Sequence, residues 1–271
     1  MLLSLECLVY DLTMKIEGLT RGQLNFRDLG GIPVKGNKIV RPGMFYRSAG
    51  LYWMRHVERE VFQDLGIREV LDLRSKEECA RCPDPVFDGV EMLQHSGLVS
   101  KGGEDIDFSI QGMNQIGGDA IVQYEKLKQY YMEMPFGNDA FKVMFDTILQ
   151  GKVPLLFHCA TGKDRTGAAA MVLLLALGAQ REDILEDYML SKEERADRLA
   201  YIYQKYADRM EGHPELKRLL TMKEGVLEEI GRAMLDAIET RYTSPETFLL
   251  QEYGLDETAI QKIRMIGTCE K

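Results

Sequence analysis

Residues 153–167 read VPLLFHCATGKDRTG, and this stretch decides the fold that we expect. An apolar run leads into a turn that contains glycine, and the turn leads into the start of a helix. A strand–loop–helix unit of this kind directs backbone N–H groups and a helix N-terminus at one point, which makes an anion site. Cys159 stands at the end of the strand in that positive field. Its pKa is therefore expected to fall, so that its sulfur can act as a nucleophile.

Arg165 follows Cys159 by six residues, and its planar guanidinium can close over the loop and bind phosphoryl oxygens. The Thr166 hydroxyl can then reach the sulfur and assist its departure. A Cys-x5-Arg pattern alone is weak, and a buried cysteine beside a surface arginine is the simpler alternative. The pattern is nevertheless absent at every other cysteine, namely Cys7, Cys79, Cys82 and Cys269. A nucleotide-binding P-loop is excluded, because Asp164 stands where such a loop requires Ser or Thr.

Composition sets limits on the partners. The 271 residues suffice for one large domain, and we expect an N-terminal extension over 1–24 and a single domain over 25–271. The formal net charge of -9 argues against a nucleic-acid partner. The apolar run 168–179 is too short for a membrane span. The five cysteines are scattered along the chain, and the N-terminal residues make a poor signal peptide. Both features favour a cytoplasmic location, with secretion by another route left open.

The pattern before residue 166 is α/β. Short apolar runs that suit strands cover residues 44–46, 70–73, 90–93 and 153–157. Helical patterns cover 53–65 and 139–150, the second with Asp139 as its expected N-cap. The segment 96–118 is rich in glycine and polar residues, which indicates a long loop. We therefore expect a central, mostly parallel sheet flanked by helices.

The C-terminal half reads as helical. The apolar helix 168–179 comes first and a helix over 182–190 follows. The sequence Ser191-Lys192-Glu193-Glu194 matches a capping box that opens a further helix to about residue 206. A helix over 223–242 follows. Ser244-Pro245 is expected to start the next helix and Gly254 to end it, and Asp256 is expected to cap a last helix.

HCATGKDRTG resembles the phosphate-binding loop of protein tyrosine phosphatases, and within them it is similar to the atypical bacterial family of tyrosine, serine and lipid phosphatases. Residues 25–31 (NFRDLGG), 46–51 (YRSAGL) and 72–75 (DLRS) match further motifs of that family in the same order. The stretch from 236 to 256 is similar to its ending. The resemblance therefore covers most of the chain.

The resemblance implies a role for each matching residue. Cys159 is the nucleophile and Arg165 the phosphate clamp. Asp164 is the general acid, in place of the separate Trp-Pro-Asp loop of ordinary tyrosine phosphatases, since the only tryptophan, Trp53, is followed by methionine. Asp72 is a second carboxylate that lines the site. The residues expected to bind the phosphate are His158, Ala160, Thr161, Gly162, Lys163, Thr166 and Gly167. No metal or cofactor is implied, and a helical lid is expected within 181–222.

The expected reaction is hydrolysis of a phosphomonoester through a phosphocysteine, by a tyrosine phosphatase of broad or dual specificity. Its partners are a phosphorylated protein and, in the loop, phosphate or other oxyanions. A phosphoinositide is the alternative substrate, because Lys163 adds charge to the loop and because this lysine, together with Asp164 just before Arg165, also resembles phosphoinositide phosphatases. A phosphate-binding pseudoenzyme is the alternative of another class, although such a protein usually loses the cysteine or the arginine.

Two smaller features stay open. The pair Cys79 and Cys82 has the spacing of a redox or half zinc site, but two incidental cysteines explain it as well. Arg47 and Arg74 are expected to form structural ion pairs with Asp28 or Asp72.

Overall fold

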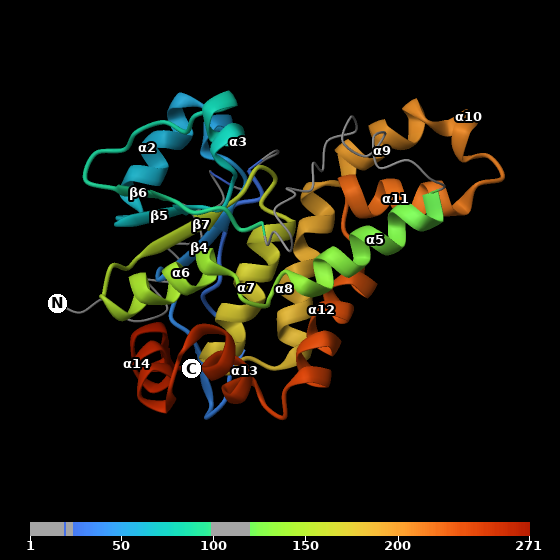
Figure 1. Cartoon of the computed structure of the whole chain (residues 1–271). Coiled ribbons are helices and arrows are strands. Elements are labelled where there is room, and N and C mark those ends of the chain that lie inside the picture. The colour runs from blue at the N-terminus through green and yellow to red at the C-terminus, as the bar shows by residue number, and fades with distance from the viewer. Residues whose placement is uncertain (1–18, 20–23, 99–119) are drawn as a thin grey trace.

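The computed structural model describes residue 19 and residues 24–98 and 120–271 (Figure 1). Its main sheet is mostly parallel, as expected. The strand order is β1 (Arg27–Asp28), β4 (Phe45–Ser48), β7 (Leu155–His158), β5 (Glu69–Asp72) and β6 (Glu91–Gln94), and among these pairs only that of β1 with β4 is antiparallel. A small antiparallel sheet joins β2 (Pro33–Val34), β3 (Lys38–Val40) and β8 (Thr268–Glu270).

Both faces of the main sheet are covered. On one face Tyr46, Val70 and Leu156 pack in a cluster with Phe62 of α2 (His56–Asp64). The other face packs against α6 (Asp139–Leu149) and α7 (Asp164–Leu177), and Figure 1 shows α2 and these two helices on opposite sides of the strands. Burial on both faces explains why the strands read as continuous apolar runs rather than as alternating patterns.

The C-terminal half is helical, as expected. The other helices of the described residues are η1 (Leu51–Trp53), α3 (Lys76–Arg81), α5 (Ala120–Glu133), α8 (Arg181–Glu194), α9 (Ala196–Lys205), α10 (Ala207–Met210), α11 (Pro214–Glu224), α12 (Glu228–Arg241), α13 (Pro245–Tyr253) and α14 (Glu257–Gly267). In the part of the chain that the structure describes, no helix has the length and apolar character needed to cross a membrane.

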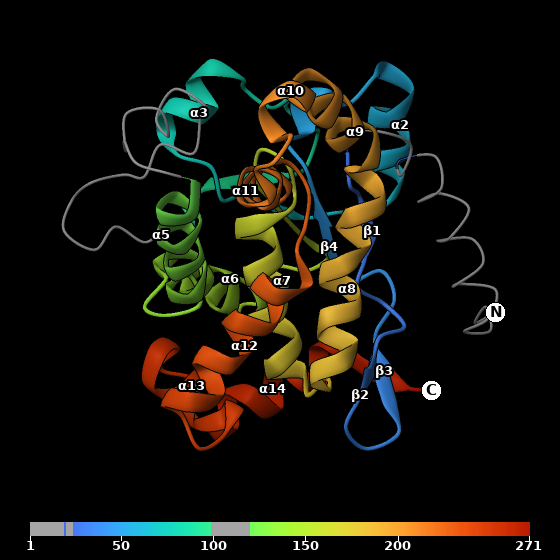
Figure 2. The same ribbon diagram turned by 90° about the vertical axis from the view of Figure 1, so that its right-hand side faces the viewer.

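Helix α7 is the centre of the fold. Every residue from Thr166 to Leu177 is buried, and Gly178 ends the helix in the left-handed conformation. Helices α6, α8, α13 and α14 pack around it. Helix α5 packs against α11 and α12, and Figure 2 shows this helical lobe beside α7.

Several helix boundaries differ from the expected ones. The N-cap of α6 is Asn138, whose side chain accepts from the Ala140 amide, and not Asp139. Ser191 opens no helix: it lies buried within α8, which ends only at Glu194. The expected caps Ser244, Gly254 and Asp256 are confirmed. Most of the segments 1–24 and 96–118 lies outside the described residues.

Candidate active site

Cys159 follows the last residue of β7, and the loop that it opens leads directly into α7. Ser48 at the end of β4 and Asp72 at the end of β5 are both in register with His158. The carboxyl ends of three parallel strands therefore meet below the loop. In open α/β sheets this edge is where ligands bind.

Gly162 is required by the shape of the loop. Its φ is +65°, and a Cβ at this position would lie 2.5 Å from the carbonyl carbon of Ser48. Its carbonyl accepts from Asn25 Nδ2 at 2.9 Å and from Arg47 Nη2 at 3.0 Å. The C=O and N–H of a trans peptide point in opposite directions, so this anchoring turns the Lys163 amide toward the interior of the loop.

The N-terminal part of the loop is held in the same way. The carbonyl of Ala160 accepts from the Gly50 amide at 3.3 Å, and that of Thr161 accepts from Asn25 Nδ2 at 3.4 Å. The loop carbonyls thus face the surrounding protein. The amides that follow them are thereby turned toward the interior of the loop.

A buried ion cluster fixes these anchors. Arg47 is fully buried and pairs with Asp187 of α8 rather than with Asp28, which corrects one of the two expected pairings. Arg27 binds the other oxygen of Asp187 at 2.8 Å and also the Asn25 side chain, at 2.6 Å. Removal of a single member would leave a buried charge without its partner, which is strongly destabilising. Helix α8 is thereby tied to the phosphate loop.

The sulfur of Cys159 lies in a positive field. Burial raises the pKa of this thiol, but the charge of Arg165 and hydrogen bonds from Thr166 outweigh burial and hold the pKa below its usual value. The Thr166 hydroxyl is buried, and the described residues offer it no nitrogen or oxygen partner. This hydroxyl is one of the groups that lower the pKa of the Cys159 thiol.

Arg165 is held in place by Glu78 of α3. Its Nη1 and Nη2 donate to the two carboxylate oxygens of Glu78 at 2.5 and 2.8 Å, and Nη1 also reaches the Leu73 carbonyl at 3.3 Å. Two parallel bonds fix the plane of a guanidinium better than one. The same carboxylate accepts from the Ser75 amide in the capping box of α3, so the start of this helix and the clamp are positioned together.

Lys163 and Asp164 lie side by side, with Lys163 Nζ 3.4 Å from Asp164 Oδ2. Lys163 is 2% exposed, and its ammonium donates at 2.8 Å to the carbonyls of Met222 and Lys223 at the end of α11. The expected extra cation is thus bound to a helix C-terminus, where a positive charge is favourable.

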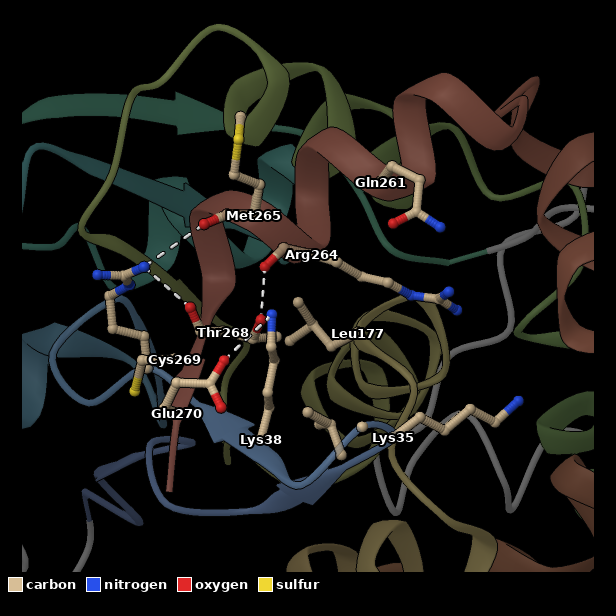
Figure 3. Close-up of a pocket in the computed structure, with 12 residues that line it drawn as sticks. Lys35, Lys38, Leu177, Gln261, Arg264, Met265, Thr268, Cys269 and Glu270 are labelled. Carbon is tan, nitrogen blue, oxygen red and sulfur yellow. Dashed lines mark hydrogen bonds and ion pairs between the residues drawn. The ribbon is translucent and has the colours of Figure 1, made fainter.

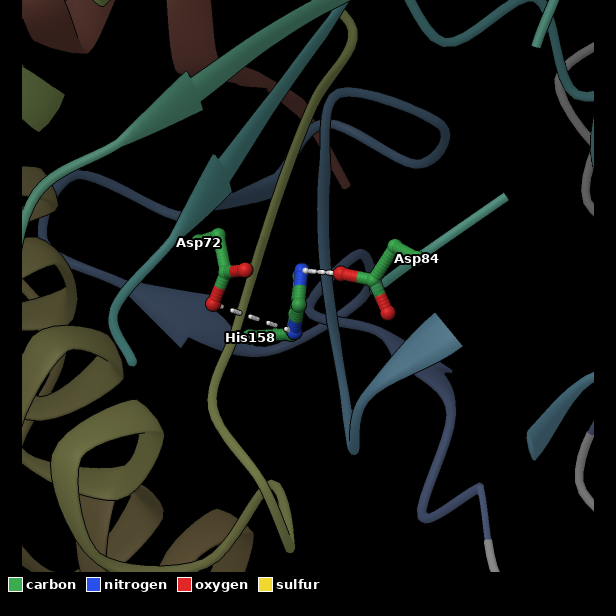
Figure 4. Close-up of side chains that lie close together, drawn as sticks. All are labelled: Asp72, Asp84 and His158. Carbon is green, nitrogen blue, oxygen red and sulfur yellow. Dashed lines mark ion pairs between the residues drawn. The ribbon is translucent and has the colours of Figure 1, made fainter. Parts of the chain in front are cut away.

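His158 lies below the loop between two carboxylates (Figure 4). Its Nε2 is 3.2 Å from Asp84 Oδ2, and its Nδ1 is 3.8 Å from Asp72 Oδ1. Burial lowers the pKa of this imidazole, but the two carboxylates outweigh burial and raise it. The three side chains present ligand atoms within 4.8 Å of one another, as a metal site would. Arg74 already supplies the positive charge there, since its Nη2 is 2.6 Å from Asp72 and 2.5 Å from Asp84.

Asp72 is therefore part of this ion network. Burial raises the pKa of its carboxyl, but hydrogen bonds from Arg74 outweigh burial and lower it to about 2. The expected pairing of Arg74 with Asp72 is confirmed. The Cys79 thiol also donates to Asp72, at 3.1 Å. Burial and this carboxylate raise the pKa of Cys79 to about 12, so that it stays a thiol.

A hollow of about 650 Å³ lies far from Cys159, between the small sheet, α14 and the C-terminal end of α7 (Figure 3). Helix α7 has 14 residues, a length of about 20 Å, and the phosphate loop is at its other end. Two arginines that line the hollow bind helix-end carbonyls: Arg41 that of Ile266 and Arg264 that of Ala176. This hollow is separate from the candidate active site.

A family model matches residues 19–266, and its description is the tyrosine phosphatase family. The chain belongs to the tyrosine phosphatase family. The resemblance inferred from the loop motifs is thereby confirmed. Cysteine-dependent phosphatases of this type need a nucleophilic thiol, and in this chain the loop holds Cys159 with Arg165 beside it.

Three relatives are named as phosphatases. A Cupriavidus necator protein named as a tyrosine-protein phosphatase is 34% identical over 174 residues, which cover 64% of this chain and 62% of that protein. The triple specificity protein phosphatase PtpB of Mycobacterium tuberculosis is 28% identical, and the match covers 90% of this chain and 96% of PtpB. A tyrosine-protein phosphatase of Nostoc commune is 28% identical, with coverage of 82% and 73%.

Sequence reasoning missed several supporting residues. Glu78 carried a local signal, because Ser75 and Glu78 have the spacing of a capping box. Asp187 and Asp84 belong to no local sequence motif. Their roles follow from pairing with residues more than nine positions away in the sequence, which only the fold brings near.

The first prediction concerns thiol ionisation. Because the pKa of Cys159 is lowered, its labelling by iodoacetate should begin at lower pH than that of a free cysteine, whose pKa is about 8.5. Cys79, whose pKa is about 12, should stay unlabelled at neutral pH. Peptide mass spectrometry after timed labelling measures both rates, and added phosphate should protect Cys159. Equal rates for the two cysteines would show that the loop does not activate the thiol.

The second prediction concerns the clamp. Glu78→Gln removes the charge and one of the two acceptors that fix Arg165, so kcat/KM should fall by on the order of 10- to 100-fold while the fold persists. Glu77→Gln, an exposed neighbour on the same helix, is the matched control and should stay near wild type. Activity of Glu78→Gln within twofold of wild type would remove Glu78 from this role.

Proposed function

We propose that this protein hydrolyses phosphomonoesters through a phosphocysteine on Cys159. The observation that carries the proposal is the buried thiol with a lowered pKa, at the start of a loop in which the carbonyls of Ala160, Thr161 and Gly162 are anchored outward. Arg165 lies beside the thiol, and its guanidinium donates to both carboxylate oxygens of Glu78. These are the parts needed to bind a phosphoryl group and attack it.

In the first step the loop amides and Arg165 bind the phosphate oxygens. The Cys159 thiolate attacks phosphorus, an S–P bond forms and the P–O bond to the leaving group breaks. Asp164 gives its proton to the departing oxygen. In the second step the ionised Asp164 takes a proton from water, which attacks phosphorus. The S–P bond then breaks, and the sulfur leaves as a thiolate beside the Thr166 hydroxyl.

Asp164 is the better candidate for the general acid. It is the first residue of α7 and lies next to both Arg165 and the loop. Asp72 has a pKa of about 2 and accepts several hydrogen bonds from Arg74. A carboxyl that stays ionised near neutral pH has no proton to give. We therefore propose Asp164 as the acid and Asp72 as a structural carboxylate.

We propose a phosphorylated protein as the substrate, with phosphotyrosine first and a broad specificity. The relative PtpB is named for triple specificity, which supports breadth in this chain as well. The phosphoinositide alternative rests on Lys163 and on Asp164 before Arg165. The ammonium of Lys163 is bound to two carbonyls of α11, so this contact does not favour the alternative. The helical lid also stays a proposal: Arg195, between α8 and α9, lies near enough to Cys159 and Asp164 to interact with their charges.

The third prediction tests the nucleophile. Cys159→Ser should lower turnover of every substrate by on the order of 10⁴-fold or more, because a serine hydroxyl is not ionised at neutral pH. Binding of phosphate or vanadate should persist, since the amides and Arg165 remain. Phosphate release should be measured on phosphotyrosine, phosphoserine and phosphoinositide substrates. Substantial activity in the variant would mean that the nucleophile is another residue.

The fourth prediction tests the acid. Asp164→Asn should lose on the order of 10²- to 10³-fold on an alkyl phosphate but far less on a nitrophenyl phosphate, whose leaving group needs little protonation. Asp72→Asn is the comparison: its loss should be similar on both substrates, since it disturbs an ion network. The reverse pattern, with a selective loss in Asp72→Asn, would assign the acid to Asp72.

A further inference from the structure

Lys163 joins the phosphate loop to a helix that lies about 60 positions further along the chain. Its ammonium donates to the carbonyls of Met222 and Lys223, both at 2.8 Å, and the residue is 2% exposed. These carbonyls belong to the last turn of α11, which ends before Gly225. The last carbonyls of a helix have no partner within the helix, so they need a donor from elsewhere. Lys163 supplies that donor from the loop.

The next carbonyl of this helix end is bound from another part of the chain. Arg195, between α8 and α9, donates from Nε to the carbonyl of Glu224 at 2.9 Å and from Nη2 to its carboxylate at 3.3 Å. Two cations therefore bind three successive carbonyls of α11, at the end of the helix dipole where positive charge is favourable. Lys163 accounts for two of these three carbonyl contacts.

The other anchors of the loop come from a different region of the sequence. The carbonyls of residues 160–162 are held by residues that all precede α2. Lys163 comes next and is the N-cap of α7. The anchored carbonyl before it turns its amide toward the interior of the loop, while its side chain points to α11. One residue thus contributes its backbone to the anion site and its side chain to a helix contact.

We propose that Lys163 is a positioning residue that couples anion binding in the loop to the docking of α11, meaning the state in which the end of α11 is bound to its ammonium. The inference rests on the proposed function, in which the loop binds phosphate. If α11 moves away, the ammonium loses both carbonyl acceptors, and a buried charge without partners is costly. The side chain must then rearrange, and the amide moves with it.

The coupling is reciprocal. An anion that needs the Lys163 amide in place stabilises the docked state of α11. By thermodynamic linkage, docked α11 strengthens anion binding by the same factor. The loop is thereby held from two sides, by the segment before α2 and by α11.

The fifth prediction concerns amide hydrogen exchange of α11 in the full chain, with inorganic phosphate as the probe. Opening of α11 that releases Lys163 should also release phosphate. Exchange in the last turn of α11 should therefore slow by up to about 10-fold at a phosphate concentration ten times its Kd. Helix α14, which packs at the far end of α7, should be unchanged. Mass spectrometry of peptides from both helices measures the two rates.

Lys163→Met tests the link itself, because it keeps the length of the side chain and removes the donor. This variant should lose the phosphate-dependent protection of α11, and phosphate binding should weaken by on the order of 10-fold. Titration calorimetry measures the binding. If the variant does not fold, the exchange of the wild-type protein with and without phosphate still decides the proposal.

Lys217→Met is the matched control. Lys217 is an exposed lysine of α11, and its ammonium lies over the ring of Tyr203, 5.2 Å from the ring centroid. The variant makes the same substitution on the same helix and leaves the bonds of Lys163 intact, so both the protection and the phosphate affinity should persist. Asp164→Asn separates the coupling from the proposed acid. It removes the charge next to Lys163 but keeps both carbonyl bonds, so the protection of α11 should persist there too.

The outcomes distinguish the coupling from the proposed function, since none of these measurements needs turnover. The coupling is overturned if phosphate binds the wild-type protein without slowing exchange in α11, or slows it equally in α11 and α14. It is also overturned if Lys163→Met weakens binding but keeps the protection. In each of these cases the proposed function stands. If phosphate does not bind the wild-type protein at all, the proposed function fails, and the coupling fails with it.

Discussion

The anchoring of the Gly162 carbonyl is the interaction on which the rest of the site depends. Asn25 and Arg47 hold this oxygen from outside the loop, and only a glycine fits against the backbone of Ser48. Turning one carbonyl outward turns the next amide inward, so a contact remote from the substrate creates the anion site. Because Arg47 is fully buried, it in turn needs Asp187, and the position of α8 follows from that need.

Charge is arranged in pairs around the loop, although the chain as a whole carries a net charge of -9. Glu78 lies behind Arg165, and two carboxylates lie behind Arg74. Each carboxylate fixes the direction of a cation in a buried region where an unpaired charge would be costly. The positive potential at Cys159 therefore comes from orientation, through amides, a helix N-terminus and one fixed guanidinium, rather than from an excess of basic residues.

The sequence predicted what depends on local pattern. The strand before Cys159, the turn at Gly162 and the apolar helix after it are contiguous, so these elements could be predicted from the local sequence pattern. Long-range partners could not be inferred. Ser191 illustrates the limit: its capping-box pattern is real, but Asn25 and Arg27 bind its hydroxyl inside α8 instead. Tertiary hydrogen bonds of this kind override a local propensity, and no single sequence shows them.

The central claim is that phosphate passes through the sulfur of Cys159. The most direct test is a rapid acid quench during turnover of phosphotyrosine, followed by peptide mass spectrometry of the segment that contains residue 159. The account predicts one phosphoryl group on Cys159 in wild type, which accumulates in Asp164→Asn with a good leaving group, because Asp164 then no longer activates water. A quenched enzyme that turns over substrate but carries phosphate on another residue, or on none, would contradict it.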